Sequence, residues 1–183
     1  MVDKNMEKVA SRLYKGSLKY YQDREFWKAA RELIILLDYY PQFSDADGVL
    51  AHLGECMYAM EMYKSASKMF RFLLKKYPES QYVAQGLYGL QRIHYQTENH
   101  DESIRIYHGI LQGYPKTDLL DGINYFGGMA YFHKHDYDNA IASLGKVRSR
   151  SEFFDYSLYT VGLSYLKSRK KKVSTNLCMP CAS

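Results

Sequence analysis

The sequence has few cysteines, few prolines and no long apolar run. Three cysteines in 183 residues do not make a disulfide framework. No run of about 18 apolar residues is present, so we expect no transmembrane helix. Residues 1–16 lack the apolar segment of a signal peptide. We therefore expect either an intracellular, cytoplasmic protein or one whose targeting segment is missing from this sequence.

Motifs for catalysis are missing as well. The sequence contains no phosphate-binding loop, nucleophile elbow or HExxH motif, so we expect no enzyme and no cofactor. His133 and His135 are the densest potential metal ligands, but alternate residues on a helix point roughly 200° apart, so we expect no metal site. Cys56 is expected to be a buried free thiol. Cys178 and Cys181 form a CxxC in a tail without strand–helix context, so neither a redox nor a metal role is expected.

The formal net charge of +5 comes from one short basic segment near the end of the chain. This segment consists of Lys167, Arg169, Lys170, Lys171 and Lys172. Without it, basic and acidic residues are equal in number, so the folded body carries no strong nucleic-acid footprint. We interpret the segment as a solvated helix end.

What the sequence does contain is a repeat with a period of 37 residues. Tyr-Pro pairs recur at Tyr40, Tyr77 and Tyr114. A mostly small residue recurs in the same register at Ser17, Gly54, Gln91 and Gly128, and a second one at Ala29, Ala66, Ser103 and Ala140. Apolar stripes at helical spacing flank these positions, and proline ends each unit because it cannot continue a helix. The unit is therefore helix, tight turn, helix, and it becomes stable when copies stack.

The repeats predict an all-α protein, a solenoid of four helix–turn–helix units and a final helix. The expected repeats cover residues 10–43, 47–80, 84–117 and 121–152, the final helix covers 153–169, and 170–183 form a basic, disordered tail. Trp27 is expected to anchor the first helix pair or the N-terminal edge. In the final helix we expect Leu158, Val161, Gly162 and Tyr165 to face inward, and polar residues such as Ser157, Thr160 and Ser164 to help form a polar outer face.

These positions resemble the tetratricopeptide repeat. Its signature positions are occupied in the second unit by Leu50, Leu53, Gly54, Met57, Ala66, Phe70, Leu73 and Pro78. The resemblance implies a right-handed superhelix whose first helices line a concave groove for peptides or partner proteins. The period of 37 resembles a bacterial envelope subgroup that includes an outer-membrane assembly lipoprotein and the periplasmic partner of the Tol–Pal system. If a targeting segment was removed, we therefore expect the periplasm or envelope.

In this family, positions 5, 9 and 12 of the first helices face the groove, because they form a stripe separate from the core positions. The expected groove residues are Tyr14, Leu18, Tyr21, Tyr58, Tyr88, Arg92, Tyr95, Tyr125, Met129, Phe132 and Tyr159. Tyrosine suits recognition because it offers a rigid apolar face and a hydroxyl. The family's two-carboxylate clamp for chaperone C-termini is absent, since it needs Lys and Asn at positions 5 and 9.

The sequence therefore favours a non-catalytic scaffold that binds a peptide or partner protein. Two readings of the tyrosines compete with this one: they fill a tightly wound superhelix, or they bind another copy of the chain. The second of these makes the protein a structural self-association module and a possible homo-oligomer. An RNA-binding repeat is less favoured, because one-base-per-repeat reading uses varied polar residues.

Overall fold

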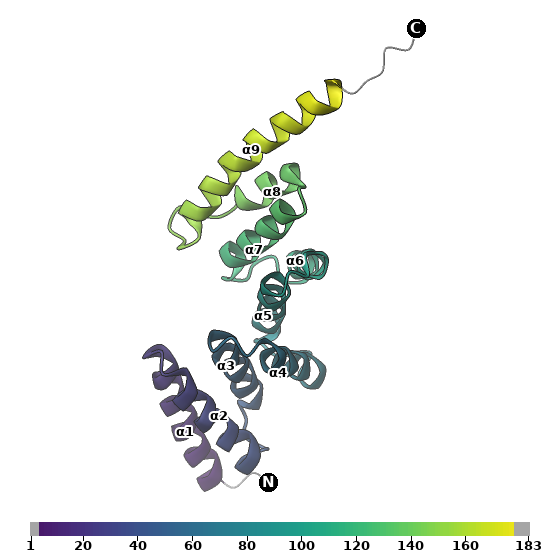
Figure 1. Ribbon diagram of the computed structural model, residues 1–183. Coiled ribbons are helices and arrows are strands. Elements are labelled where there is room, and N and C mark those ends of the chain that lie inside the picture. The colour runs from purple at the N-terminus through teal and green to yellow at the C-terminus, as the bar shows by residue number, and fades with distance from the viewer. Residues whose placement is uncertain (1–3, 178–183) are drawn as a thin grey trace. The chain divides into compact units, whose positions relative to one another are not determined.

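The computed structural model describes residues 4–177, and over this range the chain is helical without strands (Figure 1). This confirms the predicted all-helical repeat fold. None of these helices is both long and apolar enough to cross a bilayer. The helices are α1 (Lys4–Gln22), α2 (Phe26–Tyr39), α3 (Ala46–Ala59), α4 (Tyr63–Lys76), α5 (Val83–Gln96), α6 (His100–Gly113), α7 (Leu120–His133), α8 (Tyr137–Leu144) and α9 (Phe154–Leu177).

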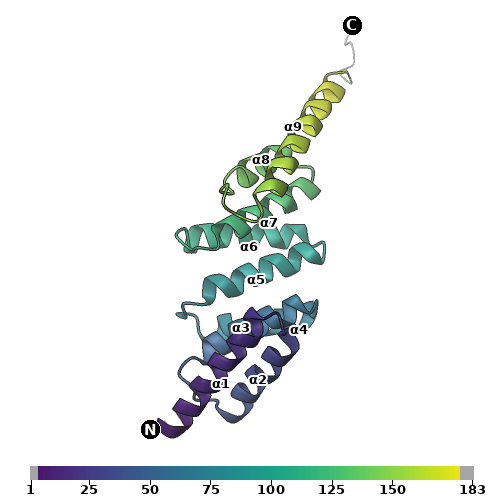
Figure 2. The same ribbon diagram turned by 90° about the vertical axis from the view of Figure 1, so that its left-hand side faces the viewer.

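The chain divides into two compact units, residues 1–93 and 94–183, with the division inside α5. In the first unit, α1 packs on α2, α2 on α3 and α3 on α4. In the second unit, α6 packs on α7, α7 on α8 and α8 on α9. Consecutive helices within each unit lie side by side in both ribbon views (Figures 1 and 2). Each unit is thus a stack of neighbouring helices, as a solenoid requires.

The turn inside each repeat has the same backbone geometry. A non-glycine residue with a φ of 59–61° recurs every 37 residues, at Arg24, Glu61, Glu98 and His135. The amide of the next residue donates to a carbonyl five residues earlier, as from Met62 to Met57 at 2.8 Å. This is the Schellman ending of a helix, which usually places glycine at the left-handed position. The first helices therefore end in this hydrogen-bonded turn although no glycine occupies its left-handed position.

Small residues let the paired helices approach closely. A Cβ added at Gly54 of α3 would lie 2.5 Å from the ring of Phe70, and one added at Gly89 of α5 would lie 2.4 Å from the same ring. Phe70 of α4, which is fully buried, therefore fits against glycines of two first helices. In the second unit, Gly128 of α7 stands in the same relation to Leu144 of α8. Leu53, Ala66 and Leu73 are buried as the sequence predicts.

The expected role of Trp27 is wrong. Its side chain is 70% exposed in the first turn of α2, so it cannot anchor the helix pair. The neighbouring Phe26 packs instead, edge to face on Tyr21 with ring centroids 5.6 Å apart. One residue of helical rotation, about 100°, separates the two rings.

The final helix differs from the prediction in length and in orientation. α9 continues past residue 169 to Leu177, while Cys178 and Cys181 lie outside the described residues. Ser157, Thr160 and Ser164 are buried, so the polar face expected outside is the packed one. Each hydroxyl donates to the carbonyl four residues earlier, which satisfies it inside the helix.

The reversal follows from which helix α9 packs against. The matching positions in α3 are Val49, His52 and Cys56, and α3 packs on α2 of the preceding repeat. α9 likewise packs on α8. Leu158 and Tyr165, which were expected inside, belong to the face that a second helix of the same repeat covers in α3 and α7. They are exposed here.

Candidate partner-binding surface

The tyrosines at position 5 do not line an open groove in the first unit. Tyr14 and Tyr88 are only 6% and 8% exposed. The Tyr14 hydroxyl lies 3.0 Å from Nδ1 of His52 on α3, and its ring meets Phe43 edge to face. Burial raises the pKa of Tyr14 far above its usual range. The expectation that Tyr14 and Tyr88 face a groove is corrected, because the first helices are close enough for these rings to fill the space between them.

The charged centre of the first unit is an ion pair between position 9 of α3 and position 9 of α5. Nη2 of Arg92 donates to both carboxylate oxygens of Glu55, at 2.6 and 2.7 Å. The two side chains are only 13% and 9% exposed. The Arg92 guanidinium carbon also lies 4.2 Å from the ring centre of Tyr58 and 4.5 Å from that of Tyr88. Two rings and one carboxylate therefore hold the guanidinium in place.

Electrostatics keep Arg92 protonated in this pair. Burial by itself lowers the pKa of Arg92, but the charge and hydrogen bonds of Glu55 and the nearby tyrosines outweigh it and raise that pKa. Tyr21 borders the same pair, and burial followed by the charge of Glu55 raises its pKa to about 12. Arg92, Glu55 and neutral tyrosines therefore form a surface without net charge at neutral pH.

Tyr21 and Tyr58 are half-buried, so each ring presents part of its area to solvent beside the Glu55–Arg92 pair. Tyr21 is held by Phe26 and by His52, whose ring centroid lies 6.0 Å from its own. Tyr58 is held by Arg92 and by Tyr63. We call Tyr21, Glu55, Tyr58 and Arg92 the Glu55–Arg92 surface. Leu18, the other predicted groove residue of α1, is half-buried and packs against the core of this unit.

The predicted groove residues of the second unit form a separate aromatic group. Tyr95 lies against Phe126 and His133, at centroid distances of 5.4 and 5.8 Å. Tyr125 stacks on Phe153 at 4.7 Å. Lys167 of α9 lies 5.2 Å above the ring of Phe132. The predicted groove residues Tyr95, Tyr125, Met129 and Phe132 are half-buried, whereas Tyr159 is exposed.

Sequence reasoning included Arg92 and missed Glu55. The signal was available: opposite charges stand at position 9 of consecutive first helices, 37 residues apart. Equivalent positions on neighbouring first helices face the same side, so a Glu and an Arg there meet. The sequence does not show how close α3 and α5 lie, so it does not show that the two charges pair.

His133 and His135 lie at the turn between α7 and α8. His100 and His133 stack with centroids 4.9 Å apart. His135 instead points its Nδ1 to the Tyr137 hydroxyl at 3.1 Å. Within residues 4–177, no three His, Cys, Asp or Glu side chains converge as ligands.

Comparison with known proteins relates this geometry to one family. Residues 50–80 match the sequence model of the tetratricopeptide repeat. A solved structure of MamA, residues 41 to the end, from Desulfovibrio magneticus RS-1 is 14% identical with a TM-score of 0.70, covering 91% of this chain and 90% of that one. Another MamA structure is 16% identical with a TM-score of 0.70, covering 95% and 88%.

A tetratricopeptide repeat protein from Parabacteroides merdae ATCC 43184 is 14% identical with a TM-score of 0.67, covering 89% of this chain and 64% of that one. No curated protein matches the chain. At these identities the solved structures establish the likeness of fold, and residues 50–80 resemble a tetratricopeptide repeat. The envelope subgroup and the partner stay predictions.

Proposed function

We propose that this helical-repeat chain, whose residues 50–80 match the tetratricopeptide repeat, is a non-catalytic scaffold that binds a peptide or partner protein across the Glu55–Arg92 surface. The observation that carries the proposal is the pair of half-buried rings, Tyr21 and Tyr58, held next to an almost buried ion pair. A partner that covers these rings gains apolar burial. The rings lose little conformational entropy on binding, because they are already held.

The surface favours an apolar or aromatic side chain of the partner over a free carboxylate. Both oxygens of Glu55 already accept from Nη2 of Arg92, so an incoming carboxylate would have to compete with Glu55 for that donor. The exposed parts of Tyr21 and Tyr58 instead offer ring area and hydroxyl groups. We therefore propose that an apolar anchor of an extended or helical peptide packs on the exposed parts of these rings.

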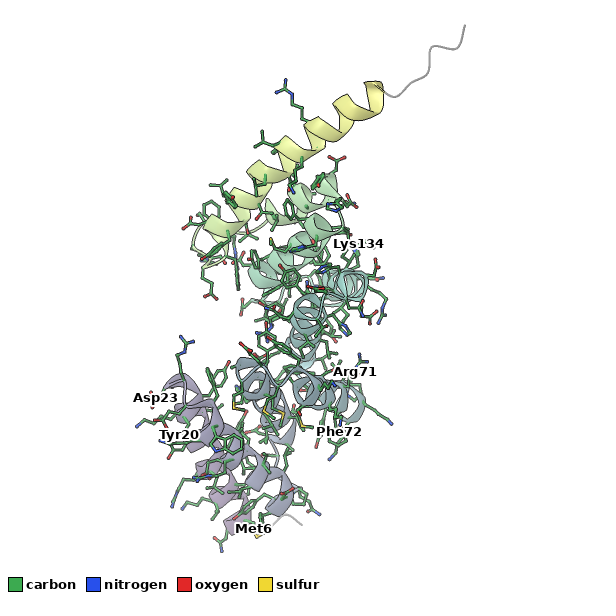
Figure 3. The ribbon with its side chains drawn as sticks, viewed as in Figure 1. Met6, Tyr20, Asp23, Arg71, Phe72 and Lys134 are labelled. Carbon is green, nitrogen blue, oxygen red and sulfur yellow. The ribbon has the colours of Figure 1, made fainter. Side chains whose placement is uncertain are left out.

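The test compares the affinity of a captured partner for the parent chain and for the double variant Tyr21→Ala/Tyr58→Ala. An aromatic anchor contributes about 2 kcal/mol at a hot spot, so two additive losses weaken binding roughly 10²–10³-fold. Phe72→Ala is the matched control, because Phe72 is also exposed but lies with Arg71 on the side of α4 away from α3 (Figure 3). It should bind like the parent.

Thermal unfolding of each variant, followed by circular dichroism, separates lost binding from lost folding. If the double variant folds and binds as tightly as the parent, the partner site lies elsewhere. If Phe72→Ala loses binding instead, the site is the outer face of the second helices.

A further inference from the structure

α9 presents a free apolar face in the second unit. Four large side chains on this face are mostly exposed: Leu158 (60%), Tyr159 (68%), Tyr165 (61%) and Leu166 (63%). A Cβ added at Gly162 would meet no atom within 4 Å. A shallow hollow runs along this face, lined by Asp155, Leu158, Tyr159, Gly162, Leu163 and Leu166. So large an apolar stripe on one helix marks an interaction surface.

The repeat register shows what kind of element this face accepts. Gly162 occupies the position of Gly54 and Gly128, and in α3 and α7 a side chain of the following helix fills that place, Phe70 and Leu144 respectively. α9 packs on α8 with its opposite face. Within the part of the chain that the structure describes, no helix covers the Gly162 face. The face therefore fits a helix.

The residues around Gly162 form a self-complementary pattern. Asp155 and Arg169 stand seven residues before and after it, and Leu158 and Leu166 stand four before and after. Tyr159 and Tyr165 stand three before and after. At about 100° per residue, all six lie within roughly 60° of the direction of Gly162. An antiparallel helix of the same sequence that crosses at Gly162 therefore places its Arg169 level with Asp155 and its Leu166 level with Leu158.

We propose that α9 pairs antiparallel with α9 of a second copy of this chain, crossing at Gly162. In this arrangement Asp155 of each copy lies at the level of Arg169 of the other, and the two-fold symmetry makes this contact twice. A parallel pair would instead put Asp155 beside Asp155 and Arg169 beside Arg169. Both side chains are exposed and free to reach across. Glycine at the crossing allows the helices to approach closely.

This self-association is separate from the proposed partner surface, because it uses α9 alone. A single pair of helices makes a small interface, so the dimer should be weak and its dissociation constant on the order of micromolar or above. Sedimentation equilibrium of the full chain over a wide concentration range should show monomer and dimer in exchange.

Charge reversal gives the decisive test. Asp155→Arg and Arg169→Asp each place like charges together twice, so each variant alone should dimerise at least about tenfold more weakly. In an equimolar mixture the two variants form a heterodimer in which both contacts again join opposite charges, so dimerisation should return. Asp23→Arg, an exposed reversal in the first unit, is the matched control and should dimerise like the parent.

Gly162→Leu provides an independent test. It should weaken the dimer at least about tenfold by separating the helices at their crossing, without lowering the melting temperature, since the site is open within one copy. Gly109→Leu in α6, also an open position, should change neither property. A parent chain that is monomeric at every concentration overturns the proposal. So does a dimer that both charge reversals leave intact, or a mixture that fails to restore it.

Discussion

At the scale of single residues, the main feature is the ion pair of Glu55 and Arg92. Both side chains are almost buried, and both oxygens of Glu55 accept from Nη2 of Arg92. Such a pair adds little stability compared with an apolar pair, but removing one partner leaves an uncompensated charge out of water. The pair therefore fixes how α3 and α5 are positioned more than it strengthens the fold.

Glu55→Gln should lower the free energy of unfolding by about 3 kcal/mol, because Arg92 then keeps its buried charge without a counter-charge. Urea denaturation followed by circular dichroism measures this. Glu102→Gln is the matched control, since Glu102 pairs with Arg105 at the surface, and this variant should lower the free energy of unfolding much less, because water screens such pairs. Equal losses in the two variants would show that Arg92 is solvated.

Gly54 and Gly16 provide a second contrast between residues. Gly54→Leu should destabilise the protein by roughly 1–3 kcal/mol, because any side chain there overlaps the ring of Phe70. Gly16→Leu should not destabilise, since its Cβ position is open. Melting temperatures of the two variants test this, and a similar drop in both would contradict the close packing of α3 on α4.

At the scale of helices, the four second helices of the repeats begin in one geometry with different capping chemistry. The N-cap residues Glu25, Met62, Asn99 and Asp136 are 37 residues apart. Asn99 and Asp136 accept a hydrogen bond from the amide three residues later, whereas Glu25 and Met62 have no side-chain cap. α4 therefore begins without a bond that α6 and α8 possess.

Met62→Asp should stabilise the protein by about 1 kcal/mol, because the new carboxylate can accept from the amide of Ser65 as Asp136 accepts from Asn139. Met62 is partly exposed, so little packing is lost. Met62→Leu, which cannot cap, is the control. An unchanged melting temperature for Met62→Asp would mean that the turn at Glu61 holds the cap side chain away from the helix.

At the scale of the molecule, stability in each unit comes from stacking of neighbouring helices. α3 packs on α1, α2 and α4, whereas α9 packs only one face, against α7 and α8. In a stack of this kind, elements with fewer packed neighbours open at lower free energy.

Amide hydrogen exchange at low protein concentration should therefore be faster in α9 than in α3. Raising the concentration into the range of the proposed dimer should slow exchange in α9 and leave α3 unchanged, because only α9 gains a covering helix. Mass spectrometry of peptides from the two helices resolves this. Protection in α9 that equals that of α3 at every concentration would contradict this account of stacking.

The sequence by itself determined the repeat period, the helices and most of the core. These depend on local chemistry: apolar residues at helical spacing select Leu53 and Phe70 for the interior, and prolines after Tyr40, Tyr77 and Tyr114 stop the second helices. The left-handed ends of the first helices were not predicted, because Arg24, Glu61, Glu98 and His135 carry no glycine signal.

Only the tertiary structure decided which repeated positions are open. The distance between first helices buries Tyr14 and Tyr88 and joins Glu55 to Arg92, and no pattern within one helix contains that distance. α9 carries the same signature positions as α3, yet its signature face is exposed and its Ser157–Ser164 face is packed. A helix buries whichever face another helix covers. The neighbours of α9, and not its own sequence, therefore determine which of its faces is buried.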